Sequence, residues 1–184
     1  MRITGGEAKG IAIKAPKGAR VRPTSDKVRE ALFATLGEDV PGKRVLDLFA
    51  GSGALAIEAL SRGAEFAALV EKEPTVARTI ESNLQKTGLS DRAKIIRADF
   101  RSALRKLGRD KERFDLVFID PPYQSGLLDE VAEALTKHRV TNSRSIIVVE
   151  HFKKADPPES ISGLPLARTR DYGQTSLSYY QARG

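Results

Sequence analysis

The chain has no cysteine, and only two of its 184 residues, His138 and His151, are histidines. The lack of thiols excludes disulfides, thiolate-bound iron–sulfur clusters and a cysteine nucleophile, and with so few imidazoles a zinc site is not expected. No apolar run is long enough to cross a bilayer, and residues 1–6 lack the apolar segment of a secretory signal. We therefore expect a cytoplasmic protein with no metal and no membrane partner.

Positive charge, in contrast, is in excess. The formal net charge is +7, and residues 1–22 hold six lysines and arginines against one glutamate, a net charge of +5. This concentration favours an anionic partner such as nucleic acid, although a solvated basic edge would carry the same charge. We expect residues 1–22 to form a basic hairpin or arm and residues 23–184 to form the main domain. The candidate nucleic-acid contacts are Arg2, Lys9, Lys14, Arg22 and Lys27.

Strand-length apolar runs alternate with helical patterns from residue 44 onward. The runs cover 45–49, 66–70, 94–98, 115–119 and 145–150, and the helical patterns cover 54–62, 74–86, 101–107 and 126–136. Near-continuously apolar strands are typical of a parallel sheet that is buried on both faces. Repeated strand–helix units of this length predict a doubly wound α/β fold.

The two ends of the chain depart from this rhythm. Residues 2–15 carry a weak hairpin signal, and a helix should open at residues 23–25 and end near Leu36. Near the C-terminus, the patterns at 164–171 and 175–181 indicate two strands that pair antiparallel and close the sheet. The predicted fold is therefore a Rossmann-like sheet of seven strands with a small N-terminal β-hairpin.

A glycine loop within residues 47–56 follows the first predicted strand and opens a helix. Gly51 and Gly53 permit a tight turn and a close backbone approach to a ligand, a pattern shared with dinucleotide-binding proteins. Asp47 would repel a pyrophosphate, but it suits the ammonium and sulfonium groups of S-adenosylmethionine. The loop therefore predicts a nucleoside cofactor, Asp47 favours S-adenosylmethionine, and Phe49 is a further candidate contact.

Two more acidic residues end the second and third predicted strands. Glu71 can accept both hydrogen bonds of a ribose diol, which serves NAD and S-adenosylmethionine equally. Asp99 can accept from an adenine amine with Phe100 over the ring, although taken alone Asp99 is better explained as a helix N-cap. Because ligands bind at the carboxyl ends of such strands, we assign these residues, with Lys72, to the cofactor site.

The tetrapeptide Asp120-Pro121-Pro122-Tyr123 follows the fourth predicted strand. Hydrogen bonds from an exocyclic base amine to the Asp120 carboxylate and the Pro121 carbonyl would localise the nitrogen lone pair toward a methyl donor. Tyr123 offers a flat face for stacking of an extruded base, worth about 1–3 kcal/mol. In isolation a Pro-Pro turn that ends a strand explains the segment better, but downstream of the glycine loop it indicates amine methylation, with Asp120, Pro121 and Tyr123 as catalytic candidates.

These motifs, with residues 2–6, 22–33 and 58–64, resemble the bacterial RNA guanine-N2 methyltransferases of the small-subunit ribosomal RNA methyltransferase D family. The resemblance covers essentially the whole chain. It implies S-adenosylmethionine as cofactor and methylation of N2 of one guanine in 16S ribosomal RNA, within an assembled or partly assembled small subunit. We further expect a monomer. Ala56 and Glu73-Pro74 depart from the usual family pattern without touching the residues that carry the chemistry.

Three other functions remain open from the residues alone. The same tetrapeptide serves methylation of adenine N6 in DNA or of a glutamine side chain, although 184 residues leave little room for a DNA target-recognition domain. A non-catalytic RNA-binding assembly factor would keep the fold but would not need Asp120 and Tyr123. An NAD-dependent oxidoreductase is disfavoured by Asp47 and by the lack of a well-placed general acid.

Overall fold

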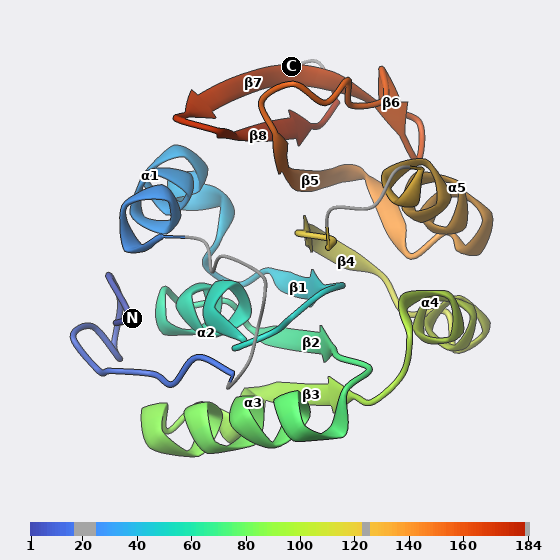
Figure 1. The fold of residues 1–184 in the computed structure, drawn as a ribbon. Coiled ribbons are helices and arrows are strands. Elements are labelled where there is room, and N and C mark those ends of the chain that lie inside the picture. The colour runs from blue at the N-terminus through green and yellow to red at the C-terminus, as the bar shows by residue number, and fades with distance from the viewer. Residues whose placement is uncertain (17–24, 123–125, 183–184) are drawn as a thin grey trace.

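The computed structural model describes residues 1–16, 25–122 and 126–182, and these form one eight-stranded sheet with helices on both faces (Figure 1). The spatial order of the strands is β3-β2-β1-β4-β5-β8-β7-β6. Strands β1 to β5 pair in parallel, whereas β8, β7 and β6 are added antiparallel. The strands are β1 (Arg44–Asp47), β2 (Phe66–Val70), β3 (Ala93–Ile96), β4 (Phe114–Ile119), β5 (Thr141–Phe152), β6 (Ser160–Ile161), β7 (Leu164–Tyr172) and β8 (Thr175–Tyr180).

The doubly wound fold is confirmed, and all seven predicted strands are present, but the count of seven was wrong. The eighth strand, β6, consists of Ser160 and Ile161 in the connector after β5, and it pairs with the start of β7. Two residues are too short to show an apolar alternation, so the sequence carried no signal for this strand.

In the described part of the chain, five helices cover the two faces of the sheet. They are α1 (Asp26–Leu36), α2 (Ala54–Ser61), α3 (Pro74–Thr87), α4 (Phe100–Arg109) and α5 (Leu127–His138), with 3₁₀ turns at Gly37–Asp39 and Ser90–Arg92. Helices α1, α2 and α3 lie on one face and α4 and α5 on the other (Figure 1). None of the helices in the described ranges is long and apolar enough to cross a membrane.

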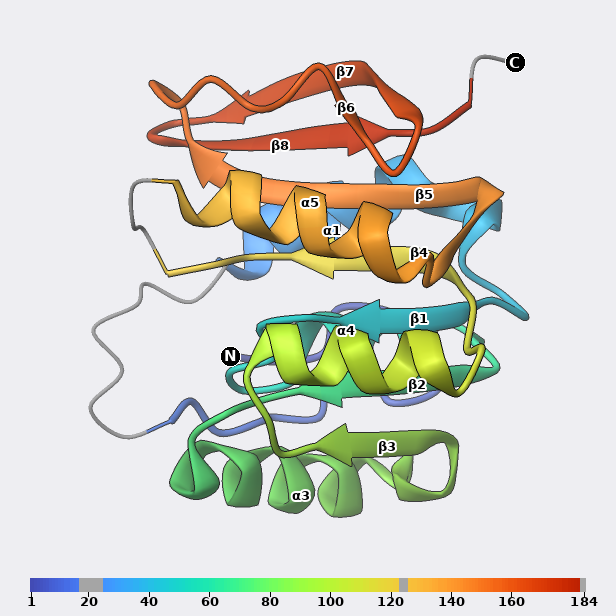
Figure 2. The same ribbon diagram turned by 90° about the vertical axis from the view of Figure 1, so that its right-hand side faces the viewer.

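The strands are apolar throughout because both faces of the sheet are buried. In β4, Leu116 and Phe118 belong to the core cluster under α1–α3, whereas Val117 and Ile119 belong to the cluster under α4 and α5. Strands β1 to β4 all point the same way, so the loops that follow them meet at one edge of the sheet (Figure 2). That carboxyl edge is where ligands bind in folds of this kind.

Residues 1–16 form a hairpin-like loop rather than a pair of regular strands. The loop has a single antiparallel bridge, Arg2 to Ala12, and the Ile3 N–H donates to the Ile11 carbonyl at 3.0 Å. Its side chains Ile3, Ala8 and Ile13 are buried in the same core cluster as α1, α2 and α3. The first sixteen residues are therefore packed onto the main domain, and a functional boundary at residue 22 stays a prediction.

Candidate functional site

A cavity of about 550 Å³ opens at the carboxyl edge of the sheet, large enough for a nucleoside cofactor. The loops after β1, β2, β3 and β4 all contribute to its lining, together with Ala15 and Pro16 from the N-terminal segment. The structure thus brings together eight of the residues predicted from the sequence: Asp47, Phe49, Gly51, Glu71, Lys72, Asp99, Phe100 and Asp120.

The two glycines of the loop after β1 have different roles. Both have positive φ, +53° at Gly51 and +79° at Gly53, a region that side chains with a Cβ rarely adopt. Gly51 lines the cavity, whereas a Cβ on Gly53 would meet side chains of Ile57, Ile80 and Leu69 at 3.2 Å. Gly53 therefore packs the start of α2 against the interior and is not part of the cavity lining.

Asp47 ends β1 with its side chain in the cavity wall and almost no exposed surface. Burial raises its pKa from 3.8 to about 7, and the nearby Glu71 carboxylate adds to the rise. The backbone N–H groups of Phe49 and Ala56 act in the opposite direction but do not cancel the effect of burial. Because a cation in the cavity would favour the ionised carboxylate, the position fits an ammonium group.

Glu71 connects the loops after β1 and β2. One carboxylate oxygen accepts from the Gly51 N–H at 3.1 Å and the other accepts from the Glu73 N–H at 2.9 Å. These two bonds fix the plane of the carboxylate at the cavity, next to the exposed Lys72. A carboxylate with a fixed orientation is well suited to accept hydrogen bonds from a diol.

Asp99 caps helix α4, as the alternative explanation of this residue predicted. Its Oδ1 accepts from the N–H groups of Arg101 at 2.9 Å and Ser102 at 3.3 Å, and hydrogen bonding from Ser102 lowers its pKa. The residue also lines the cavity. Next to it, Phe100 contacts Phe49 with ring centroids 5.6 Å apart, so the two aromatic rings form an apolar wall.

The Asp-Pro-Pro segment reaches the same cavity from β4. Strand β4 pairs with β1 through Asp47 and Phe118, and Asp120 follows two residues later. Asp120 and Pro122 line the cavity, while Pro121 is buried. Tyr123 lies outside the described residues, so its predicted stacking role stays a prediction.

Among the described residues, none of the predicted nucleic-acid contacts is part of the cavity lining, although Lys14 directly precedes the lining residue Ala15. Arg2, Lys9, Lys14 and Lys27 are all exposed, and the Arg2 guanidinium donates to the Gly10 carbonyl at 3.0 Å. Arg22 lies outside the described residues. These cations are therefore available to a large partner and separate from the lining of the cavity.

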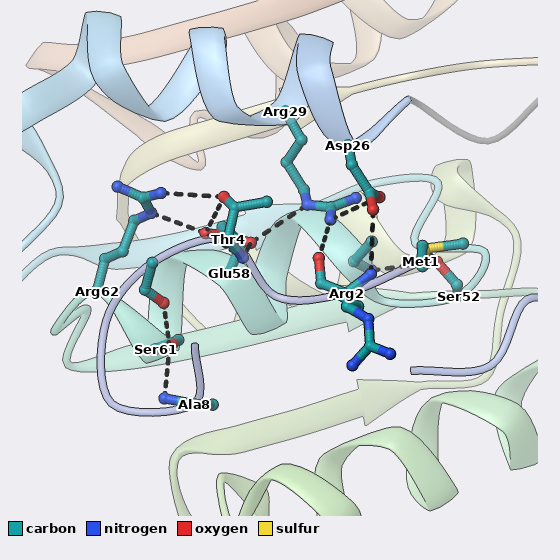
Figure 3. Close-up of polar contacts among 12 residues, drawn as sticks. Met1, Arg2, Thr4, Ala8, Asp26, Arg29, Ser52, Glu58, Ser61 and Arg62 are labelled. Atoms are coloured by element: carbon teal, nitrogen blue, oxygen red, sulfur yellow. Dashed lines mark hydrogen bonds and ion pairs between the residues drawn. The ribbon is translucent and has the colours of Figure 1, made fainter. Parts of the chain in front are cut away.

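A buried ion-pair network that the sequence did not reveal holds the N-terminal segment in place (Figure 3). The Glu58 carboxylate, fully buried on α2, accepts from the Thr4 N–H and hydroxyl, and from the guanidinium groups of Arg29 and Arg62. Arg29 is also fully buried and donates to the Arg2 carbonyl. Arg29 has charged neighbours on α1, as on a solvent-exposed face, whereas Glu58 stands among apolar residues on α2. Neither local pattern identifies the other residue or Thr4 as a partner, so the sequence did not reveal this docking.

The fold, with its cavity at the carboxyl edge of the sheet, is that of class I methyltransferases. The fold is shared with an RNA methyltransferase from Salinibacter ruber whose crystal structure is a complex with S-adenosylhomocysteine, at a TM-score of 0.67 and 16% identity, covering 86% of this chain and 92% of that one. A much closer structure is that of a hypothetical protein from Thermus thermophilus, with a TM-score of 0.85, 33% identity and 99% of both chains covered.

Sequence comparison identifies the family. A family-wide profile described as "Conserved hypothetical protein 95" matches residues 1–181. Ribosomal RNA small subunit methyltransferase D of Escherichia coli K12 is 34% identical over 98% of this chain and 89% of its own length. The chain therefore belongs to this methyltransferase family, as the sequence motifs predicted.

Proposed function

We propose that the protein transfers a methyl group from S-adenosylmethionine to the exocyclic N2 amine of a guanine in 16S ribosomal RNA, in the cytoplasm. S-adenosylmethionine is the methyl donor of the family to which the chain belongs. The observation that carries the proposal is the position of Asp120, because it lines the cavity together with Asp47 and Glu71. A carboxylate that can hold an amine thus stands beside the predicted cofactor site.

The residues of the cavity fit the parts of the cofactor. The buried Asp47 carboxylate suits the methionine ammonium, and Glu71, fixed by two backbone N–H groups, suits the ribose diol. The Phe49–Phe100 wall provides the apolar surface that an adenine ring needs, with Asp99 at its rim. When bound, S-adenosylmethionine supplies an electrophilic methyl group on a sulfonium.

The chain's own contribution to the chemistry is to position and activate the amine. The lone pair of a guanine N2 is delocalised into the ring, which makes it a weak nucleophile. Hydrogen bonds to the Asp120 carboxylate and the Pro121 carbonyl orient the amine and localise the lone pair. The amine loses one proton on methylation, and the Asp120 carboxylate accepts it or passes it to water.

The basic N-terminal segment supplies the contacts to the RNA backbone in this proposal. Arg2, Lys9, Lys14 and Lys27 are exposed cations on or beside the segment. Contacts of this kind bind phosphates without reading sequence, so they do not themselves select the guanine. The resemblance to the family implies RNA within an assembled or partly assembled small subunit. The substrate in the proposal is therefore the ribonucleoprotein particle.

The proposal is tested by methyl transfer to small subunits purified from cells that lack the protein. We expect the wild-type protein to produce N2-methylguanine, and Asp120→Ala to lose methyl transfer while its affinity for S-adenosylhomocysteine stays nearly unchanged. An equal loss of cofactor affinity in Asp120→Ala would overturn the role of this residue. Methylation of adenine in place of guanine would overturn the substrate, and an inactive wild-type protein that still binds the subunit would favour an assembly factor.

A further inference from the structure

Asn83 on α3 makes contacts that none of the cofactor motifs explains. Its side chain is 1% exposed. The Oδ1 atom accepts from the Lys14 N–H at 2.8 Å, and Nδ2 donates to the Lys14 carbonyl and to the Ser52 carbonyl, both at 2.9 Å. The amide thus pairs with the backbone of Lys14 as a neighbouring strand would, and it ties that backbone to the glycine loop.

These contacts fix the chain directly before it enters the cavity wall. Ala15 and Pro16 follow Lys14 and line the cofactor cavity beside Gly51 and Ser52. The proline ring fixes its own φ and restricts Ala15 to an extended backbone, so this short stretch is stiff once Lys14 is held. The position of the wall therefore depends on where Lys14 is anchored.

The other anchors of the N-terminal segment hold residues earlier in the chain. Glu58 binds Thr4, and the Ser61 hydroxyl binds the backbone of Gly5 and of Ala8. Thr4, Gly5 and Ala8 are not part of the cavity lining. The contacts of Asn83, in contrast, are made at the residue next to the wall. A loss of Asn83 would therefore release the wall while the earlier anchors keep the segment on the domain.

We propose that Asn83 is a positioning residue that holds the backbone of Lys14, and through it Ala15 and Pro16, which form one wall of the cofactor cavity, and that it thereby sets the affinity for the cofactor. The inference rests on the proposed cofactor site and adds to it a wall that comes from outside the motifs. Its role is indirect, because Asn83 is not part of the cavity lining.

The test compares S-adenosylhomocysteine affinity in the wild-type protein, Asn83→Ala and Asn83→Asp by titration calorimetry. The aspartate keeps the size of the side chain and the acceptor for Lys14, but it replaces the donor with an oxygen that faces two carbonyls. If the wall is in place in about a tenth of the variant molecules, both variants bind S-adenosylhomocysteine about tenfold more weakly. Affinities within about twofold of wild type in the folded variants would overturn the proposal.

Thr87→Val is the matched control for general destabilisation. Thr87 lies one turn further along α3, is buried, and its hydroxyl donates to the carbonyls of Asn83 and Leu84, within its own helix. We expect this variant to melt at a lower temperature than wild type with an unchanged affinity for S-adenosylhomocysteine. A parallel loss of affinity in Thr87→Val would show that destabilisation of α3 alone weakens binding, and would overturn the specific role of Asn83.

A double-mutant cycle with Pro16→Gly separates positioning from a purely structural role. Pro16→Gly loosens the wall itself and should weaken binding alone. An unchanged affinity in this variant would remove the role of the wall, and would overturn the proposal even if the Asn83 variants do not fold. In the Pro16→Gly background, Asn83→Ala should add less than about a twofold further loss, and fully multiplicative losses would overturn the proposal. Glu71→Ala tests the cofactor site itself. If this variant keeps the wild-type affinity for S-adenosylhomocysteine, the proposed cofactor site is wrong. If it binds more weakly while the Asn83 variants bind normally, the cofactor site stands and only the role of Asn83 is refuted.

Discussion

Among the individual side chains of the cavity, Asp47 combines deep burial with a position that suits the cofactor ammonium. Its pKa is raised to about 7, above the ordinary value of 3.8 that it has in the unfolded chain. Between these values the folded protein holds a proton that the unfolded chain has released. The stabilising contribution of this group is therefore present at acidic pH and is lost as the pH rises to about 7.

Cofactor binding should restore the ionised form of Asp47. An ammonium beside Asp47 favours the carboxylate, so binding of S-adenosylhomocysteine releases a proton when the pH is below about 7, and affinity rises as the pH rises toward that value. Calorimetry at about pH 6.5 in two buffers of different ionisation enthalpy measures the released proton. Asp47→Asn should bind more weakly and release no proton, and the same proton release in this variant would assign it to another group.

Glu71 is the second single residue on which the cofactor site depends. Glu71→Ala removes a charged acceptor, and we expect it to weaken S-adenosylhomocysteine binding by about 1.5–3 kcal/mol. Glu73→Ala is the matched control, because its side chain is exposed and outside the cavity lining. Calorimetry of both variants checks the prediction, and equal dissociation constants for Glu71→Ala and wild type would place the ribose elsewhere.

At the scale of the elements, the N-terminal segment is held to α1 and α2 by the buried Glu58. Removal of one partner from a buried ion pair leaves the other charge uncompensated, so Glu58→Ala should lower the free energy of unfolding by about 3–5 kcal/mol. The exposed pair of Glu81 and Arg97 provides the comparison, and Glu81→Ala should change stability by less than about 1 kcal/mol. Urea denaturation of both variants measures the difference, and similar small losses would show that the network adds little to the docking.

The elements that could be predicted from the sequence are those whose signal is local. The central strands are apolar at successive positions, as Leu116 to Ile119 are, because both faces of the sheet are buried. The acids and glycines at the strand ends predicted a cofactor site, and most of them line one cavity. Asn83, by contrast, acts through contacts with Lys14 and Ser52, which lie 69 and 31 positions earlier in the chain, and no local pattern reveals such contacts. Ala15 and Pro16 carry no chemistry of their own that would mark them as a wall.

For the molecule as a whole, the packing of residues 1–16 changes how the basic segment should be tested. Deletion of the segment would remove Ile3, Ala8 and Ile13 from the core, so a truncated protein would report on folding as well as on RNA binding. Charge reversal at exposed positions leaves the core intact. We therefore choose substitutions of Lys9 and Lys14, which are both exposed.

Lys9→Glu combined with Lys14→Glu should weaken binding to the small subunit and reduce the slope of log affinity against log salt by about 1–2. Lys106→Glu combined with Arg109→Glu makes the same charge change on α4, on the opposite face of the sheet. Filter binding over a range of salt concentrations measures both. Calorimetry checks the affinity for S-adenosylhomocysteine, which should be unchanged because Asn83 binds the backbone of Lys14 and not its side chain. If the slope of log affinity against log salt falls by the same amount in the two double variants, the basic segment acts only through the net charge of the protein.

The central claim, that this protein methylates guanine N2 in 16S ribosomal RNA, is tested most directly by mass mapping of modified nucleosides. The RNA comes from cells that lack the protein and from the same cells carrying either the wild-type chain or Asp120→Ala. The account predicts that one N2-methylguanine disappears from 16S ribosomal RNA without the protein, returns with the wild-type chain and stays absent with Asp120→Ala. A full set of N2-methylguanines in cells lacking the protein, or a return of the missing one with Asp120→Ala, would contradict it.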